Sequence, residues 1–104
     1  MAKVHLICRN GRHLKPQDGP EYESGYWVFS ETQIKELLNG TLYLHQKKSE
    51  PSYFGGTISG HRLAAPEEPS PGHVVLTVVA REDCKNIAWE GDQHPMAWMG
   101  GILP

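Results

Sequence analysis

The sequence lacks the features that define several common protein classes. No apolar run approaches the roughly 20 residues that a membrane-spanning helix needs. There are two cysteines, Cys8 and Cys84, in no metal-ligand spacing, and the apolar stretch near the N-terminus is too short for a signal peptide. We therefore expect a cytoplasmic protein that has no membrane partner and keeps both thiols free and buried.

Motifs for catalysis and metal binding are also missing. The six histidines include no pair at His-x-x-x-His spacing, and the chain has neither a Cys-x-x-Cys nor a Gly-x-Ser-x-Gly motif. A catalytic dyad of Cys84 with His45 or His61 would need the fold to bring them together by chance. The sequence therefore predicts no metal site and no cofactor, and it favours a protein without catalytic activity over a small hydrolase.

Charge is unevenly distributed along the 104 residues, which we expect to form a single domain, 1–104. The formal net charge is −2, so the protein as a whole does not attract nucleic acid. Residues 1–15, however, contain four basic side chains and no acidic one, and residues 37–62 contain three basic and one acidic. If these two segments meet in the fold, a weakly acidic protein has one basic face.

One segment is typical of a helix. Ser30 stands at an N-cap position with Gln33 three residues later, which is the pattern of a capping box. Phe29 and Ile34 occupy the two positions of a hydrophobic staple, which fixes how the chain enters a helix. We predict a helix over residues 31–39.

The rest of the chain favours short strands, because glycine (11) and proline (8) are plentiful. Segment 73–81 is apolar on both faces and is expected at the centre of a sheet. Segment 9–25 is predicted to be a long loop, and the tail from residue 92 either packs back on the core or stays loose. Strands are predicted over 3–8, 26–29, 41–45, 55–63 and 73–81, with a short one over 87–91. The predicted fold class is α+β, mainly β: a small curled sheet or barrel with one well-capped helix packed against it.

The stretch HQKKSEPSYFGG, residues 45–56, carries the strongest indication of a binding surface. Alternation along the preceding strand predicts that Tyr43 and His45 face outward and lead into Lys47 and Lys48. Aromatic rings beside lysines hold single-stranded nucleic acid, because the ring stacks on a base and the cation contacts a phosphate. Small residues in the following turn leave room near a base edge. In the simpler alternative, the glycines of this turn form a β-bulge and its aromatic rings fill the core.

Four stretches together resemble the PUA-like superfamily, of which the EVE and ASCH branches are the most similar. They are YWVFS before the capped helix, NGTLYLHQKK, FGGTISGHRLA and VVLTVVAREDCKNIAW, and they cover about residues 26–90. The resemblance implies a small β-barrel with a helix outside it, which binds RNA or DNA and holds a modified or flipped base. It also implies a pocket walled by Trp27, Tyr43 and the 52–56 turn, with Lys47, Lys48 and Arg62 at the phosphates.

The sequence therefore predicts a small nucleic-acid-binding domain that recognises a base through a basic and aromatic face. The alternative is a protein-interaction module or small inhibitor, which would dock on a partner protein through its acidic surface or through the apolar tail 94–104. The predicted nucleic-acid-binding residues are Trp27, Tyr43, His45, Lys47, Lys48, Ser52, Tyr53, Gly55, Gly56 and Arg62.

Overall fold

Seven strands form one mixed sheet, in the order β2-β3-β6-β5-β4-β1-β7. The computed structural model describes residues 2–91 and 99–104. Within these residues β1 pairs in parallel with β4, and the other neighbouring strands are antiparallel. The predicted fold class, α+β and mainly β with one helix, is confirmed. The elements are β1 (Lys3–Ile7), the 3₁₀ turn η1 (Arg9–Gly11), β2 (Leu14–Pro16), β3 (Glu21–Trp27), α1 (Glu31–Leu37), β4 (Thr41–His45), β5 (Phe54–Leu63), β6 (Val74–Ala80), the 3₁₀ turn η2 (Glu82–Cys84) and β7 (Met99–Leu103).

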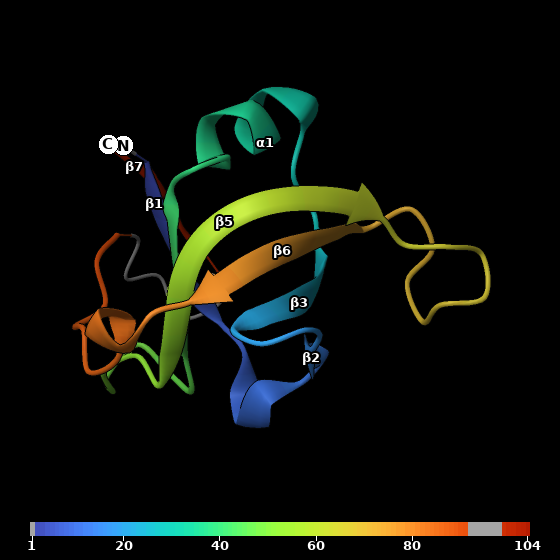
Figure 1. Ribbon diagram of the computed structural model, residues 1–104. Coiled ribbons are helices and arrows are strands. Elements are labelled where there is room, and N and C mark those ends of the chain that lie inside the picture. The colour runs from blue at the N-terminus through green and yellow to red at the C-terminus, as the bar shows by residue number, and fades with distance from the viewer. Residues whose placement is uncertain (1, 92–98) are drawn as a thin grey trace.

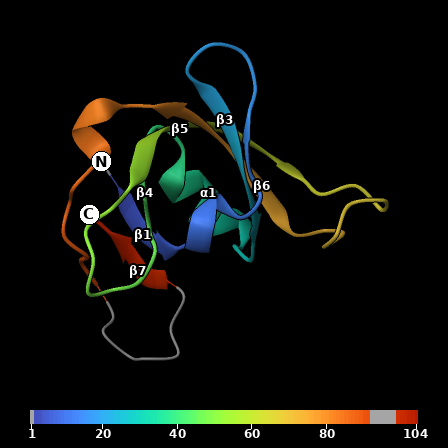
Figure 2. The same cartoon turned by 90° about the horizontal axis from the view of Figure 1, so that it is seen from below.

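Three irregularities in strand pairing within the described residues accompany a strong curvature of the sheet. The register shifts between Val4 and Leu6 in β1, between Ser24 and Trp27 in β3, and between Ile58 and Gly60 in β5. Such bulges bend a strand and increase its twist. β5 is a long curved strand, and α1 lies at one end of the curved sheet (Figure 1). In the perpendicular view the strands curve around α1 (Figure 2).

The core lies between the inner face of this sheet and the helix. Segment 73–81 was predicted as the central strand, and β6 indeed runs between β3 and β5 with apolar residues buried along it. Cys8 and Cys84 are both free and buried, as predicted. The side chains of the core cluster include Val4, Leu6, Ile34, Leu37, Leu42, Leu44, Ile58, Leu76 and Val78.

The helix begins as predicted but ends two residues early. The Gln33 N–H donates to Ser30 Oγ at 3.2 Å, and the Ser30 N–H donates to Gln33 Oε1 at 2.9 Å, so the capping box is formed. The helix ends at Leu37, because Asn39 takes a left-handed conformation (φ 67°) and its N–H donates to the carbonyl of Ile58 on β5. A tertiary bond to the sheet thus competes with the last helical turn.

Segment 9–25 is not a loop, and here the sequence prediction was wrong. It contains β2 and most of β3, which begins at Glu21 and ends at Trp27 instead of spanning 26–29. Its pattern was hard to recognise, since the first half of β3 carries exposed or half-buried polar side chains and depends on backbone pairing with β6.

The predicted strand over 87–91 is also absent, although all five residues lie in the described structure. The Ile87 N–H donates instead to Ser52 Oγ, a side-chain partner that no strand ladder provides. The last strand is β7, which pairs antiparallel with β1, so this part of the tail packs back on the fold. Residues 92–98 lie outside the described residues. No helix in the described part of the chain is long and apolar enough to cross a membrane.

Candidate functional site

The ten predicted binding residues do not gather on one surface. Tyr43 and His45 lie in a ring cluster with His5 and Trp89, in which His5 stacks on Tyr43 at a centroid distance of 4.5 Å. We predicted that His45 faces outward, but its side chain is fully buried. The reason is a contact along the chain: its Nδ1 hydrogen-bonds the carbonyl of Glu50 at 2.9 Å, in the segment that follows β4.

The two buried histidines form a hydrogen-bonded pair with a defined proton arrangement. A carbonyl oxygen can only accept, so His45 Nδ1 carries a proton and its Nε2 accepts from His5 Nδ1 at 2.8 Å. His5 Nε2 is then an unprotonated acceptor, and it has no hydrogen-bond partner in the described structure. Burial, with a smaller contribution from His45, lowers the pKa of His5 to about 4, and burial also lowers the pKa of His45. Both rings are therefore neutral at pH 7.

Ser52 and Tyr53 have structural hydrogen bonds. Ser52 Oγ donates to the carbonyl of Cys84 at 2.6 Å and is itself 2 % exposed. The Tyr53 hydroxyl donates to the carbonyl of Cys8 and accepts from the Gly11 N–H at 3.2 Å. Burial, followed by the bond to Cys8, raises the pKa of Tyr53 above its ordinary value.

Gly55 and Gly56 permit close contact between strands. A Cβ added at Gly55 would lie 2.6 Å from Cys84 Cβ and would clash with the Leu42 carbonyl. A Cβ added at Gly56 would clash with the backbone of Val79 on β6. A strand interior has no room for such overlap, so both positions require glycine for packing.

The predicted phosphate-binding cations are paired with other groups. Lys47 Nζ lies 3.3 Å from Glu50 Oε2, and Lys48 Nζ lies 5.4 Å from the centre of the Trp89 ring. Arg62 makes two contacts of 3.0 Å to Glu23 and contacts of 2.5 and 3.2 Å to Glu68. The guanidinium of Arg62, with the Ala65 N–H and the Tyr26 hydroxyl, lowers the pKa of Glu68 to about 2.

A cavity of about 720 Å³ lies elsewhere, between the end of β1, η1, the end of β3 and the loop 64–73. Its volume is within the range of about 300–1,000 Å³ that is typical of small-molecule sites. Of the ten predicted binding residues, Trp27 alone is among the described residues that line this cavity. The apolar part of the lining includes Leu6, Tyr26, Trp27, Val28 and Phe29, and the polar part includes Arg9, Arg12, His13, Ser70 and His73.

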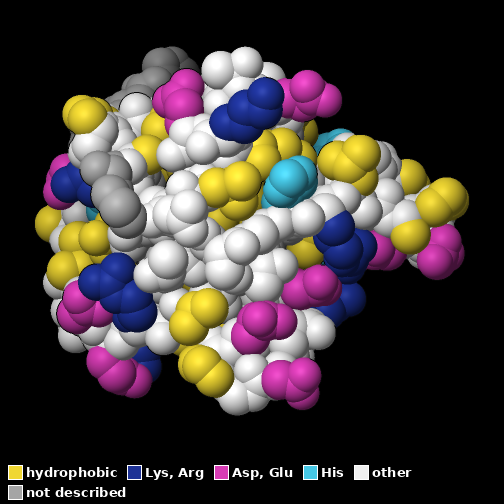
Figure 3. All heavy atoms as spheres, turned by 45° about the horizontal axis from the view of Figure 1, so that its top comes forward, with side chains coloured by type: hydrophobic (Ala, Val, Ile, Leu, Met, Phe, Trp, Pro, Cys, Tyr) yellow, Lys and Arg dark blue, Asp and Glu magenta, His cyan; other side chains and the backbone are white. Residues whose placement is uncertain are grey.

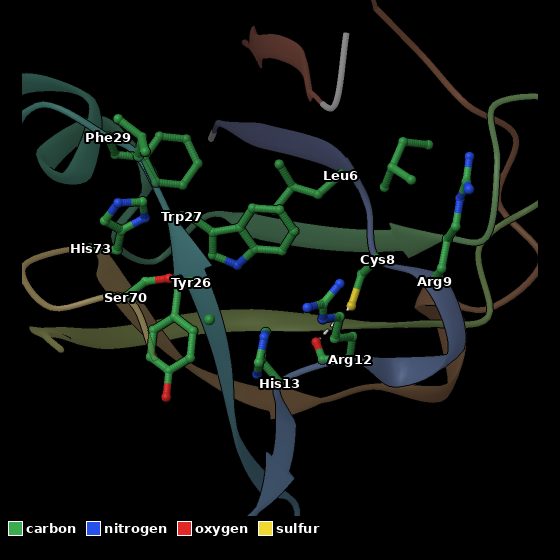
Figure 4. Close-up of a pocket in the computed structure, with 13 residues that line it drawn as sticks. Leu6, Cys8, Arg9, Arg12, His13, Tyr26, Trp27, Phe29, Ser70 and His73 are labelled. Atoms are coloured by element: carbon green, nitrogen blue, oxygen red, sulfur yellow. Dashed lines mark hydrogen bonds between the residues drawn. The ribbon is translucent and has the colours of Figure 1, made fainter. Parts of the chain in front are cut away.

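The cavity has an aromatic end and a cationic end (Figure 4). Phe29 and His73 lie at one side, the Trp27 indole lies in the middle, and Arg12 and Arg9 lie at the other side. Arg12 is exposed, and no ion pair joins it to an acidic side chain in the described part of the chain. Acidic and basic side chains are mixed on the face shown in Figure 3.

Two side chains of the stretch 45–56 hydrogen-bond the η1 turn, which carries Arg9 of the cationic end. The η1 turn needs left-handed backbone at Asn10 (φ 58°) and Gly11 (φ 67°). Tyr53 bonds the turn at Gly11, as described above, and Gln46 Oε1 accepts from the Asn10 N–H at 2.7 Å. The stretch that we predicted as the binding surface thus holds the arginine-bearing turn in place.

Sequence reasoning missed most residues of the cavity. The excess of basic side chains in residues 1–15 indicated that Arg9 and Arg12 could belong to a binding surface. Nothing in the sequence indicated that this segment lies beside Trp27. Ser70 and His73 belong to a proline-rich loop with no binding pattern of its own. Among the described residues, no group of three or more His, Cys, Asp or Glu side chains is placed to hold a metal ion.

Comparison of the chain with protein-family models, with curated proteins and with solved structures finds no match. A functional conclusion therefore depends on the chemistry of the cavity itself.

Proposed function

We propose that this protein binds single-stranded nucleic acid by taking one unstacked base into the cavity beside Trp27. The observation that carries the proposal is the position of an indole ring between an apolar end and an exposed guanidinium, Arg12, in a cavity of about 720 Å³. A base is planar and apolar on its faces, and the phosphate attached to it is anionic. The two ends of the cavity match these two parts of a nucleotide.

Two polar atoms of the lining are bonded within the protein and do not compete for the edge of a base. Trp27 Nε1 donates to Ser24 Oγ at 3.1 Å, and Cys8 Sγ donates to the Arg12 carbonyl at 3.2 Å. A stacked base contributes about 1–3 kcal/mol of binding energy. A base inside a duplex is paired and stacked on its neighbours, whereas a base in a single strand is free to stack on Trp27, so single strands are the expected ligand.

The overall charge sets the expected strength and salt dependence of binding. With a net charge of −2, attraction at long range is weak. Binding to single strands weakens with salt by a slope of about −0.7 for each phosphate neutralised, so a site built on Arg9 and Arg12 has a shallow salt dependence. Our proposal also includes membership of the PUA-like superfamily, which is supported by the mainly β fold with one helix and by Trp27 in the cavity wall.

The test is a fluorescence-anisotropy titration of short single-stranded DNA and RNA, with a duplex of the same length, at low and at physiological salt. We expect Arg12→Ala to weaken binding about tenfold, which corresponds to the loss of one hydrogen bond to a charged group. Lys15→Ala is the matched control, because Lys15 is an exposed cation of the same basic segment that does not line the cavity.

Two further variants separate this cavity from the surface predicted by the sequence. Trp27→Leu should weaken binding without changing the salt slope, and thermal unfolding of the same sample checks that the variant is folded. The double variant Lys47→Ala/Lys48→Ala should retain binding within about twofold, since neither lysine lines the cavity. Equal loss in Arg12→Ala and Lys15→Ala, or no binding by wild type at low salt, would overturn the proposal.

A further inference from the structure

The loop 64–73 forms one wall of the cavity, and two of its side chains lie at the aromatic end. Ser70 and His73 both line the cavity on the side away from Arg9 and Arg12 (Figure 4). This loop joins β5 to β6. It therefore brings polar side chains to a part of the cavity that is otherwise apolar.

The loop has a defined conformation, because bonds tie it together at both ends. The Ala64 N–H donates to the His73 carbonyl at 2.8 Å, and the Gly72 N–H donates to the Ala64 carbonyl at 3.0 Å. In addition, the His73 N–H donates to the Ser70 carbonyl at 3.1 Å. The positions of Ser70 and His73 are thus set before any ligand arrives.

A second set of bonds fastens the loop to the sheet. The Glu68 carboxylate accepts from the Tyr26 hydroxyl at 2.7 Å and from the Ala65 N–H at 3.0 Å, and it also contacts Arg62. Tyr26 in turn packs on His13 at a centroid distance of 4.8 Å. Arg62, which was predicted to contact phosphate, instead holds the cavity wall in position through Glu68.

Ser70 and His73 contribute hydrogen-bonding side chains to the aromatic end. Trp27 Nε1 and the Tyr26 hydroxyl both donate hydrogen bonds within the protein, to Ser24 and Glu68. The Ser70 hydroxyl and the His73 imidazole, by contrast, make no side-chain hydrogen bond within residues 2–91 and 99–104. A base that stacks on Trp27 presents its polar edge within this environment.

We infer that Ser70 and His73 recognise the hydrogen-bonding edge of the base; this inference depends on the proposed function. The two ring nitrogens of an imidazole are both hydrogen-bonding atoms, and a hydroxyl donates as well as accepts. The expected ligand is therefore a nucleobase whose edge carries a donor and an acceptor side by side. A ring of the same shape without these groups forms neither bond and binds less well.

The test uses single-stranded probes in which abasic residues flank one central thymine or its isostere difluorotoluene. The two rings have the same shape, but only thymine forms strong hydrogen bonds. We expect wild type to bind the thymine probe about tenfold more tightly, within the range of about 1–3 kcal/mol for a pair of base-edge bonds. Ser70→Ala/His73→Phe should reduce this ratio to about threefold or less and leave the salt slope unchanged.

His61→Phe is the matched control, since His61 is an exposed histidine of β5 that does not line the cavity. It should keep the wild-type ratio, and so should Arg12→Ala despite its weaker binding. Tight binding of both probes with no preference by wild type, or an unchanged ratio in the double variant, would overturn the inference and leave the proposed function standing. Failure of wild type to bind either probe or any longer single strand would overturn both.

Discussion

Mild acid should destabilise the fold through the buried histidine pair. The pKa of His5 is about 4 in the folded protein, against an ordinary value of 6.5. The unfolded chain therefore binds protons more readily, and the stabilisation is present above pH 6.5 and lost as the pH falls toward 4. The pKa of His45 is lowered by burial as well, so its contribution has the same sign.

The size of the effect follows from the two pKa values. A pKa difference of one unit corresponds to about 1.4 kcal/mol, so complete titration of His5 costs about 3 kcal/mol. Integrating the linkage relation from pH 7 to pH 5 gives a loss of about 2 kcal/mol in the free energy of unfolding. The His5 side chain is fully buried, so solvent screening does not reduce this figure.

The measurement is urea unfolding at several pH values between 7 and 5. Glu68, whose pKa is lowered to about 2, keeps its charge in the folded protein throughout this range. His5→Asn is the informative variant, because the amide NH₂ can replace Nδ1 as donor to His45 but does not titrate. We expect this variant to be less stable at pH 7 and to lose less stability on acidification. His61→Asn, at an exposed position, should behave as wild type. A loss below about 0.5 kcal/mol in wild type, or equal losses in wild type and His5→Asn, would refute the reasoning.

Two further predictions concern the packing of β5 against β6 and the bond that holds the η1 turn. Gly56→Ala should cost about 3 kcal/mol or more in urea unfolding because its Cβ meets the β6 backbone, whereas Gly60→Ala, with its nearest contact at 3.8 Å, should change stability far less. Similar losses in both variants would contradict the packing argument. Tyr53→Phe should cost about 1–3 kcal/mol, since the buried Cys8 carbonyl and the Gly11 N–H lose a partner, and it should also weaken oligonucleotide binding through the η1 turn. Unchanged stability in this variant would show that the hydroxyl does not hold the turn.

Local interactions explain which elements were predictable. Ser30 and Gln33 are three residues apart and hydrogen-bond each other, so the start of the helix can be recognised from residues that are close in the sequence. The β6 segment is apolar on both faces, which indicates a central strand in any mainly β fold. By contrast, β3 owes its first half to pairing with β6, and β7 owes its place to pairing with β1. These partners are distant in sequence, and the segments themselves have no strong pattern.

The same distinction applies to the candidate site. By itself the sequence determined that the fold is mainly β, that one helix begins after Ser30, and that the N-terminal segment is basic. Only the tertiary structure decided that His45 is covered by the segment after β4 and that Trp27 lies beside Arg12. It also decided that Ser70 and His73 complete the cavity. The physical reason is that a cap depends on neighbours in the chain, whereas a cavity depends on how the ends of β1, β3 and the loop 64–73 converge in space.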